Sequence, residues 1–412
     1  MKGHETRPLA RAILADRTYD IEFCGYLSNH AKHAIIALDR LQASEKRVQE
    51  YWDKYTTLTP YNLELHRLEQ NWSDIKPASR TEWEHYRGQK SNWQEQVAFM
   101  QQELKALDQN TDQLVQKYAP NLLSGIAGAL THGIIHLGWA IDARSPWMIC
   151  EGLAYLNFCH LGIDESVLHS DTHIEADPMT SFQRVANTFH TEDLQRQWIE
   201  ATKNAYDESF HRELAPAGFQ WQLAKILREP HPVATHLPTW LDKSNIEEIY
   251  ESLYQATTWL YMATRDKRGH GNFVVLHALT SLWGLEQTCR VLEKGTAGME
   301  DTIRIVVKQY YASLICLLCT AGKGFPTEAA LKKIQVTFAS TKIDPVDTDW
   351  SGVVSMGIAE SEEHNIKLVY VMKELWNRYG RWHGYLAAAK SFTVTPNIGP
   401  GEPAFSVDSK DS

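Results

Sequence analysis

The segment NLLSGIAGALTHGIIHLGWAI, residues 121–141, indicates the fold of this chain more directly than any other stretch. It is rich in glycine and alanine and contains no Asp, Glu, Lys or Arg. A helix that is apolar on all sides is buried, and small side chains allow neighbouring helices to pack closely. We therefore expect a central helix over residues 121–141 with close neighbours.

The rest of the chain has the same helical character. Apolar residues recur at intervals of three and four, and strict alternation is rare. We expect an all-α fold with one large multi-helix domain over residues 1–392. Within it, the polar residues 60–118 carry spaced aromatic side chains and predict amphipathic helices on the surface of the core. Residues 393–412 are rich in Pro, Gly and Ser, which predicts a flexible or surface-laid tail.

Composition and motifs exclude several classes of protein. The formal net charge is -10, and no Lys/Arg cluster is interleaved with aromatic residues, so we expect no nucleic-acid partner. We find no signal peptide and no stretch near the roughly 18 apolar residues of a membrane span, so we expect a cytoplasmic protein without a membrane partner. A homodimer is compatible with the sequence. The absence of G-x-G-x-x-G, P-loop and G-x-S-x-G motifs counts against Rossmann, phosphoryl-transfer and α/β-hydrolase enzymes.

Histidines occupy inward faces of several predicted helices. One alone is more often a hydrogen-bonded core residue than a ligand, but helical bundles do build metal sites from side chains on several helices. His132 and His136 project from one helix face about 6 Å apart, which suits two ligands, or a ligand and its neighbour. The four segments concerned are SNHAKHAIIAL (28–38), LTHGIIHLGWAI (130–141), GHGNFVVLHALTSLW (269–283) and EEHNIKLVYV (362–371).

Lys367 is an unusual residue on such a face. It lies one helical turn from His364 and shares its face with Leu368. Burying an ammonium costs several kcal/mol unless it is paired or neutralised. Burial favours the free amine, which can add carbon dioxide to give an anionic carbamate. Alternatively, Lys367 pairs with Glu362 or Glu363, or reaches solvent over the first turn, and the pattern alone favours this second interpretation.

These four segments, in this order over roughly residues 25–390, resemble those of the questin oxidase-like family. That family comprises fungal and bacterial oxygenases, several of which open anthraquinone or related polyketide rings. The resemblance implies an all-helical fold that holds a non-heme iron through four histidines and a carboxylated lysine. In the second segment either histidine matches the family pattern, and we favour His136 as the ligand with His132 beside it as a catalytic residue. The implied ligands are His30, His136, His277, His364 and Lys367.

The leading hypothesis is therefore an Fe(II)-dependent oxygenase that uses dioxygen to oxidise or cleave a ring of an aromatic, polyketide-like substrate of the anthraquinone or xanthone type. Some family members resemble Baeyer–Villiger enzymes that use a reduced nicotinamide, so NADPH is a second candidate cofactor. Imidazole and oxygen-anion ligands also suit zinc or manganese. Two alternatives are a zinc-dependent hydrolase with a carbamylated lysine and a metal-free helical interaction protein. Metal content after anaerobic purification separates the three.

Overall fold

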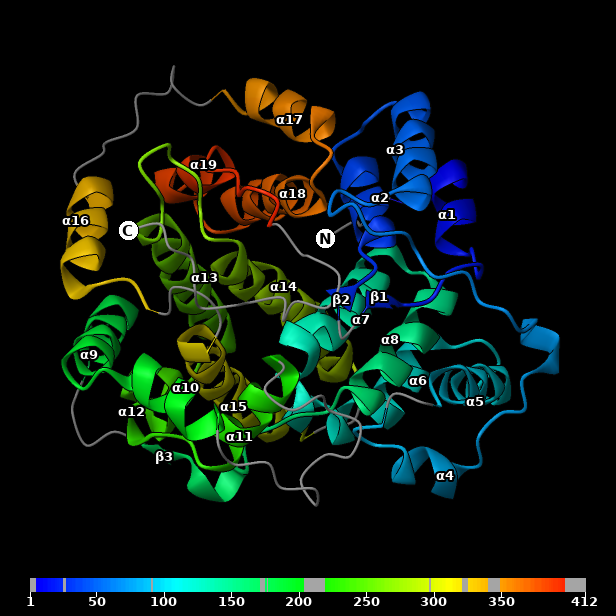
Figure 1. Cartoon of the computed structure of the whole chain (residues 1–412), viewed down its shortest axis with the longest axis horizontal. Helices are drawn as coiled ribbons and strands as arrows, with labels where there is room; N and C mark the ends of the chain where they lie inside the picture. Colours follow the sequence, from blue (N-terminus) through cyan, green and yellow to red (C-terminus); the bar gives the residue numbers. More distant parts are fainter. Residues whose placement is uncertain are drawn as a thin grey trace. The chain divides into compact units, whose positions relative to one another are not determined.

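The computed structural model describes residues 5–24, 27–89, 92–170, 175, 177–203, 219–295, 298–320, 325–339 and 349–396. Helices dominate these residues, so the all-α prediction is confirmed (Figure 1). Two short pairs of strands are present within the same ranges: β1 (Glu22–Cys24) with β2 (Leu27–Ser28), antiparallel, and β3 (His169–Ser170) with β4 (His236–Leu237), parallel. The chain divides into two compact units, which we describe separately. Unit 1 comprises Met1–Gly162 and Trp283–Val306, and unit 2 comprises Ile163–Leu282 and Val307–Ser412.

Unit 1 consists of short and medium helices around α7. In chain order they are α1 (Pro8–Leu14), α2 (Ala31–Arg40), α3 (Glu45–Thr57), η1 (Trp72–Asp74), α4 (Arg80–His85), α5 (Trp93–Ala106), α6 (Thr111–Tyr118), η2 (Ala119–Asn121), η3 (Leu123–Gly125), η4 (Gly128–Thr131), α7 (His132–Ala143) and α8 (Pro146–Phe158). Helices α1, α2 and α3 contact one another, and α5 and α7 both pack on α8. The predicted segment 60–118 therefore includes the 3-10 helix η1 and the α-helices α4, α5 and α6, and the side chains of Trp83, Trp93 and Phe99 in α4 and α5 are buried.

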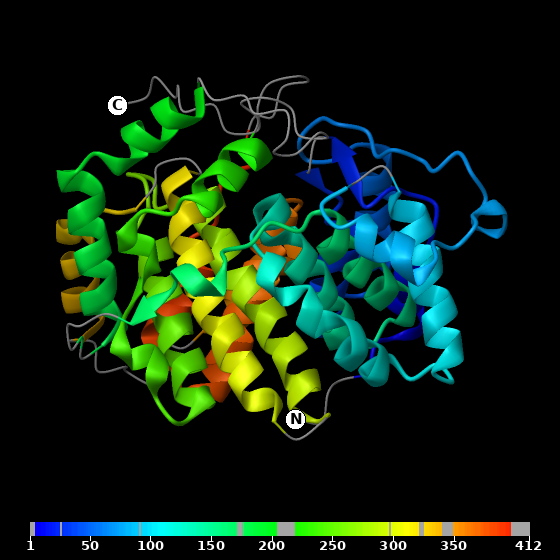
Figure 2. The same ribbon diagram turned by 90° about the horizontal axis from the view of Figure 1, so that it is seen from below.

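Unit 2 contains the longest helices. They and the shorter elements are η5 (Glu165–Val167), α9 (Pro178–Thr191), α10 (Leu194–Lys203), α11 (Phe219–Arg228), α12 (Pro232–Thr235), η6 (Thr239–Asp242), α13 (Ile246–Ala263), α14 (Phe273–Glu293), α15 (Met299–Thr320), α16 (Glu328–Ala339), α17 (Trp350–Ala359), α18 (Glu363–Arg378) and α19 (His383–Ala389). Helices α14 and α15 run side by side (Figure 2), where Tyr310 donates a hydrogen bond to the carbonyl of Ala278 at 2.7 Å. Both helices continue into unit 1.

Helix α15 has the length and apolar composition of a membrane span, contrary to the expectation that no stretch would approach one. It is the one such helix among the described residues. However, 78% of its apolar window is buried inside the protein, as in the core helix of a globular fold.

Helix α7 is central and closely packed, as the small residues predicted. A side chain on Gly138 would lie 2.1 Å from the Cα of Gly284 in α14, so the two backbones meet there. The predicted start of the helix is wrong, because residues 121–131 form 3-10 turns and α7 begins only at His132. In the preceding segment, Ala127 donates its N–H to Leu161, and the Gly125 carbonyl accepts from Leu161. These backbone groups are thus bonded to a distant part of the chain instead of the next helical turn.

The turn just before α7 is strained. Ala129, Leu130 and Thr131 have φ values of 48°, 53° and 65°, in the left-handed region that side chains disfavour. Each such residue costs of order ~1–3 kcal/mol, and strain of this kind concentrates at functional sites. The turn fixes the direction in which the first residue of α7, His132, projects.

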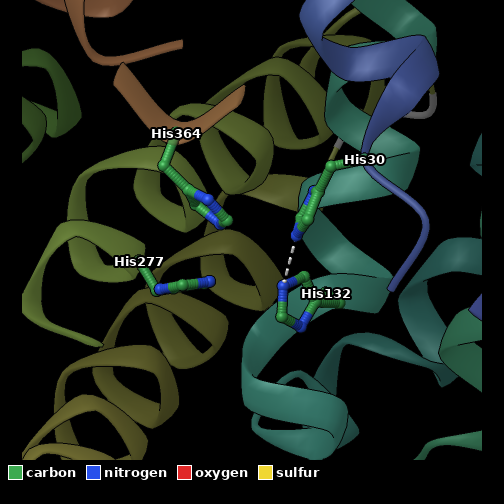
Figure 3. Close-up of side chains that lie close together, drawn as sticks. All are labelled: His30, His132, His277 and His364. Carbon is green, nitrogen blue, oxygen red and sulfur yellow. Dashed lines mark hydrogen bonds between the residues drawn. The ribbon is translucent and has the colours of Figure 1, made fainter. Parts of the chain in front are cut away.

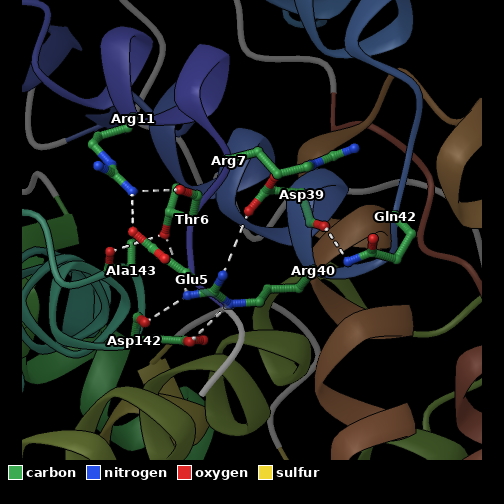
Figure 4. Close-up of polar contacts among 9 residues, drawn as sticks. All are labelled: Glu5, Thr6, Arg7, Arg11, Asp39, Arg40, Gln42, Asp142 and Ala143. Atoms are coloured by element: carbon green, nitrogen blue, oxygen red, sulfur yellow. Dashed lines mark hydrogen bonds and ion pairs between the residues drawn. The ribbon is translucent and has the colours of Figure 1, made fainter. Parts of the chain in front are cut away.

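A polar network holds α2 and α7 in parallel register (Figure 4). Near their C-terminal ends, the Arg40 guanidinium contacts the Asp142 carboxylate at 3.2 Å and donates to the Asp142 carbonyl at 2.7 Å. Arg7 binds Asp39 at 2.5 Å, and the Thr6 hydroxyl donates to the carbonyl of Ala143 at 3.0 Å. Because the two helices run side by side in one direction, the N-terminal half of α2 lies against that of α7.

Candidate metal centre

The parallel register of α2 and α7 brings four buried histidines together in unit 1. His30 lies just before α2, and its Nε2 is 2.9 Å from Nε2 of His132 (Figure 3). One turn further along, Nε2 of His33 is 3.0 Å from Nδ1 of His136. The two layers are joined because Nδ1 of His30 lies 2.9 Å from Nδ1 of His33.

The proton on His132 can be assigned from its surroundings. Its Nδ1 lies within hydrogen-bonding distance of the carbonyl oxygen of Ala129 in the strained turn. A carbonyl only accepts, so Nδ1 carries the hydrogen. In a neutral ring, Nε2 then keeps its lone pair and points it at His30. The strained turn therefore presents a nitrogen lone pair toward the second imidazole.

Unit 2 contains a second histidine pair, on α14 and α18 (Figure 3). The rings of His277 and His364 have centroids 4.8 Å apart, and the Phe273 ring packs edge-on against both. Nδ1 of His277 donates to the Phe273 carbonyl at 2.9 Å. Nδ1 of His364 donates to the Glu362 carboxylate at 2.6 Å. Both rings thus keep the Nε2 lone pair for a ligand, which is the usual arrangement for metal-binding histidines.

Buried carboxylates surround His364. Glu362 and Glu363 are 4% and 0% exposed, and they form with His364 a second group of side chains that could hold a metal ion. The other oxygen of Glu362 accepts a hydrogen bond from the Thr395 hydroxyl at 2.6 Å. The start of the predicted tail, residues 393–396, therefore packs against the beginning of α18. Residues 397–412 lie outside the described residues.

Lys367 is completely buried one turn after His364. Burial lowers the pKa of its ammonium from 10.5 to about 7, although the negative charges of Glu363 and Glu362 act in the opposite direction. A large fraction of the amine is therefore uncharged at neutral pH. The same two carboxylates are the partners of the salt-bridge interpretation, so both interpretations of Lys367 remain chemically open at this position.

This buried lysine predicts a pH-dependent stability. Between pH 7 and 10.5 the unfolded chain holds a proton on Lys367 that the folded chain releases, so the free energy of unfolding rises with pH. For the metal-free protein in carbon dioxide-free buffer, we expect the contribution of Lys367 to the free energy of unfolding to grow by roughly 2 kcal/mol from pH 7 to pH 9. Urea unfolding of the wild type and of Lys367→Met at both pH values measures it. The difference between the two proteins should change with pH, whereas Lys373→Met on the same helix should track the wild type. A pH-independent difference would contradict the prediction.

The structure places the predicted site residues in two pairs. It brings His30 together with His132, and His277 together with His364, with Lys367 following on α18. His136, which the sequence analysis favoured as the ligand, instead faces His33 on one side and the Glu151 carboxylate, at 3.4 Å, on the other. The four paired histidines are at most 3% exposed and could bind a metal ion.

Sequence reasoning missed Glu151. It is 2% exposed and binds the Lys32 ammonium at 3.0 Å. The sequence could have indicated Glu151, because it is the only Asp, Glu, Lys or Arg between Arg144 and Asp164. A lone carboxylate in so apolar a helix requires a buried partner.

Comparison with models of protein families matches residues 27–372 to the questin oxidase-like family. The chain belongs to that family. The match includes all four histidine-bearing segments and Lys367, and it confirms the resemblance seen in the sequence. No curated protein matches the chain. Membership in the questin oxidase-like family suggests oxidoreductase chemistry, of the oxygenase type, on anthraquinone-type substrates.

Proposed function

We propose that this questin oxidase-like protein is a cytoplasmic, non-heme iron-dependent oxygenase that oxidises or cleaves a ring of an aromatic polyketide-like substrate with dioxygen. The metal ligands in this proposal are His30, His132, His277, His364 and a carboxylated Lys367. The observation that carries it is the contact between His30 and His132, whose Nε2 atoms lie 2.9 Å apart.

That contact fits a metal ion. A metal ion bound by imidazole lies about 2.0–2.1 Å from each nitrogen, so two nitrogens 2.9 Å apart could both hold one ion. His132 directs a lone pair at His30, so a cation or a hydrogen must lie between the two rings. The ring nitrogens of His277 and His364 lie within 4.8 Å of each other, and in each neutral ring the lone pair is on Nε2. The donor set of neutral imidazoles is one that suits iron.

The proposal assigns both pairs to one ion, and α14 is a helix that belongs to unit 2 in its first part and to unit 1 in its second. Its first part carries His277, and its second part packs against α7, where a side chain on Gly284 would meet the carbonyl oxygen of Ile134 at 2.3 Å. Gly284 lies seven residues, or about 10 Å along the helix axis, after His277. Ile134 lies two residues after His132.

Lys367 supplies the charge in this proposal. Addition of carbon dioxide to the free amine, with loss of one proton, turns the side chain into an oxygen anion that complements the neutral imidazoles. Burial favours the free amine that this reaction requires. An ammonium at the same position would be repelled by a divalent cation.

The bound iron would supply the redox chemistry that activates dioxygen. The chain's own groups fix the site for it. The carbonyls of Ala129 and Phe273 and the carboxylate of Glu362 hold the hydrogen on the outer nitrogen of three ligand rings. The partly buried Phe273 ring packs on two of them and limits access of water from that side. A homodimer is compatible with this proposal.

Oxygen consumption tests the proposal. With Fe(II)-loaded protein we expect hydroxylated anthraquinones or xanthones to stimulate dioxygen uptake at least tenfold over the substrate-free rate, as followed with an oxygen electrode. An iron chelator should abolish the uptake, and Fe(II), but not Zn(II), should restore it. Dependence of the rate on added NADPH would assign the Baeyer–Villiger type. Turnover without dioxygen, or with zinc alone, would instead indicate the hydrolase.

A further inference from the structure

Behind His30, a row of buried polar side chains leads away from the proposed metal. His30 contacts His33, His33 contacts His136, and His136 contacts Glu151, through separations of 2.9, 3.0 and 3.4 Å. The three histidines and Glu151 are at most 3% exposed. Lys32 binds the far side of the carboxylate at 3.0 and 3.1 Å. The row is therefore continuous from a proposed ligand to a buried ion pair.

Glu151 is ionised in this arrangement. Burial alone would raise the pKa of its carboxyl group, but the Lys32 ammonium and the His136 ring outweigh burial and hold that pKa below its ordinary value. Burial lowers the pKa of His136 in spite of the neighbouring carboxylate, which keeps the ring neutral. An anion therefore stands at one end of a row of neutral imidazoles, because a charged ring is costly at such depth.

The anion gives every hydrogen bond in the row a direction. The Glu151 carboxylate faces Nε2 of His136 at 3.4 Å without a hydrogen bond at that nitrogen, and its negative charge favours the ring form with the hydrogen on Nε2. His136 then offers the lone pair of Nδ1 to His33. His33 then carries its hydrogen on Nε2 and offers Nδ1 to His30. His30 must donate from Nδ1, which leaves the lone pair of Nε2 directed at His132.

If the hydrogen bonds of the row ran in the opposite direction, the contact between His30 and His132 would become a hydrogen bond. His30 would carry its hydrogen on Nε2 and donate it to the lone pair of His132, and no cation would be needed there. His136 would then direct a lone pair at the Glu151 carboxylate, which is repulsive. The charge on Glu151 decides between the two directions.

We propose that Glu151 is a positioning residue which, through His136 and His33, holds the lone pair of His30 toward the metal. The inference deepens the proposed function and rests on His30 being a ligand. In this inference His136 transmits the effect of Glu151 to His30. The inference also gives a role to the buried charge of Glu151, which is not itself a proposed ligand.

Histidine tautomers in the metal-free protein test the inference directly. With ¹⁵N-labelled histidine, NMR correlation spectra report which ring nitrogen carries the hydrogen, and the resonances are assigned by single replacements. We expect the Nε2–H form for His33 and His136 in the wild type. In Glu151→Gln the amide can donate to His136, so both rings should change to the Nδ1–H form. An Nδ1–H form of His33 in the wild type overturns the inference, even if the variant fails to fold.

Metal affinity gives a second readout. Competition with a chelator should show Fe(II) binding weakened about 10- to 100-fold in Glu151→Gln, the range typical of groups that orient a ligand. Glu286→Gln is the matched control, since Glu286 is also fully buried and is ion-paired to Arg290 at 2.5 Å. Unchanged tautomers and affinity in Glu151→Gln refute the positioning role. A tautomer change in a protein that binds no metal would support the role and refute the proposed function.

Discussion

A His132→Ala variant is expected to lose the bound iron, with affinity for Fe(II) falling by more than about 100-fold, beyond the range of residues that only orient ligands. Its Nε2 lies 2.9 Å from that of His30, and its other nitrogen is held by the Ala129 carbonyl. Removing the ring leaves an open ligand position. Metal content after anaerobic reconstitution and gel filtration measures the loss, and circular dichroism checks that the helices remain.

The matched control is His136→Gln on the same helix face. Both histidines are buried, at 3% and 1% exposure, so each replacement is made in the core. The control should still bind one iron per chain, with affinity reduced by no more than about 100-fold, because His136 contacts His33 and Glu151. The reverse result, with iron lost in His136→Gln and retained in His132→Ala, would restore His136 as the ligand.

Replacement of Lys367 by Met is expected to remove iron and dioxygen uptake together while the helical fold persists. Methionine keeps the length and apolar stem of the lysine but cannot form a carbamate. The change also removes a buried ionisable group whose charged form is costly, so stability at neutral pH should not fall. Added bicarbonate should not rescue the variant, whereas a small carboxylate in solution should partly restore iron binding to Lys367→Ala by occupying the vacated position.

Lys373→Met, further along α18 and only half-buried, should retain full iron occupancy. Carbamate on Lys367 can also be seen directly, as a ¹³C resonance after exposure of the reconstituted protein to ¹³C-bicarbonate. Full occupancy and turnover in Lys367→Met would show that the lysine is only an ion-pair partner of Glu362 or Glu363, even if the histidine ligands are correct.

The helical fold could be predicted from the sequence because its signal is local. Apolar spacing and small residues identified the packing of α7, and inward-facing histidines identified His30 and His277 as candidates. The start of α7 could not be predicted, because the backbone of residues 125–127 bonds to Leu161, far along the chain. Local propensity contains no information about such a partner.

The sequence could not distinguish His132 from His136 either, because their distant partners are not visible in local sequence. Both lie on one face of α7, and they differ only in what other elements bring to them. The left-handed turn at Ala129 fixes the first ring, and Glu151 on α8 faces the second. Spacing along one helix predicts which side chains share a face, but the neighbours on that face are set by tertiary packing.

Helices α14 and α15 both pass through the division between unit 1 and unit 2, so the chain crosses that division three times. Neither unit is therefore encoded by one continuous stretch of the gene. A fragment that ended at Gly162 would lack Gly284 and leave the surface of α7 around Gly138 uncovered. Gene fusions and recombination between relatives therefore cannot exchange either unit as a cassette without cutting a helix, and the two must be inherited together.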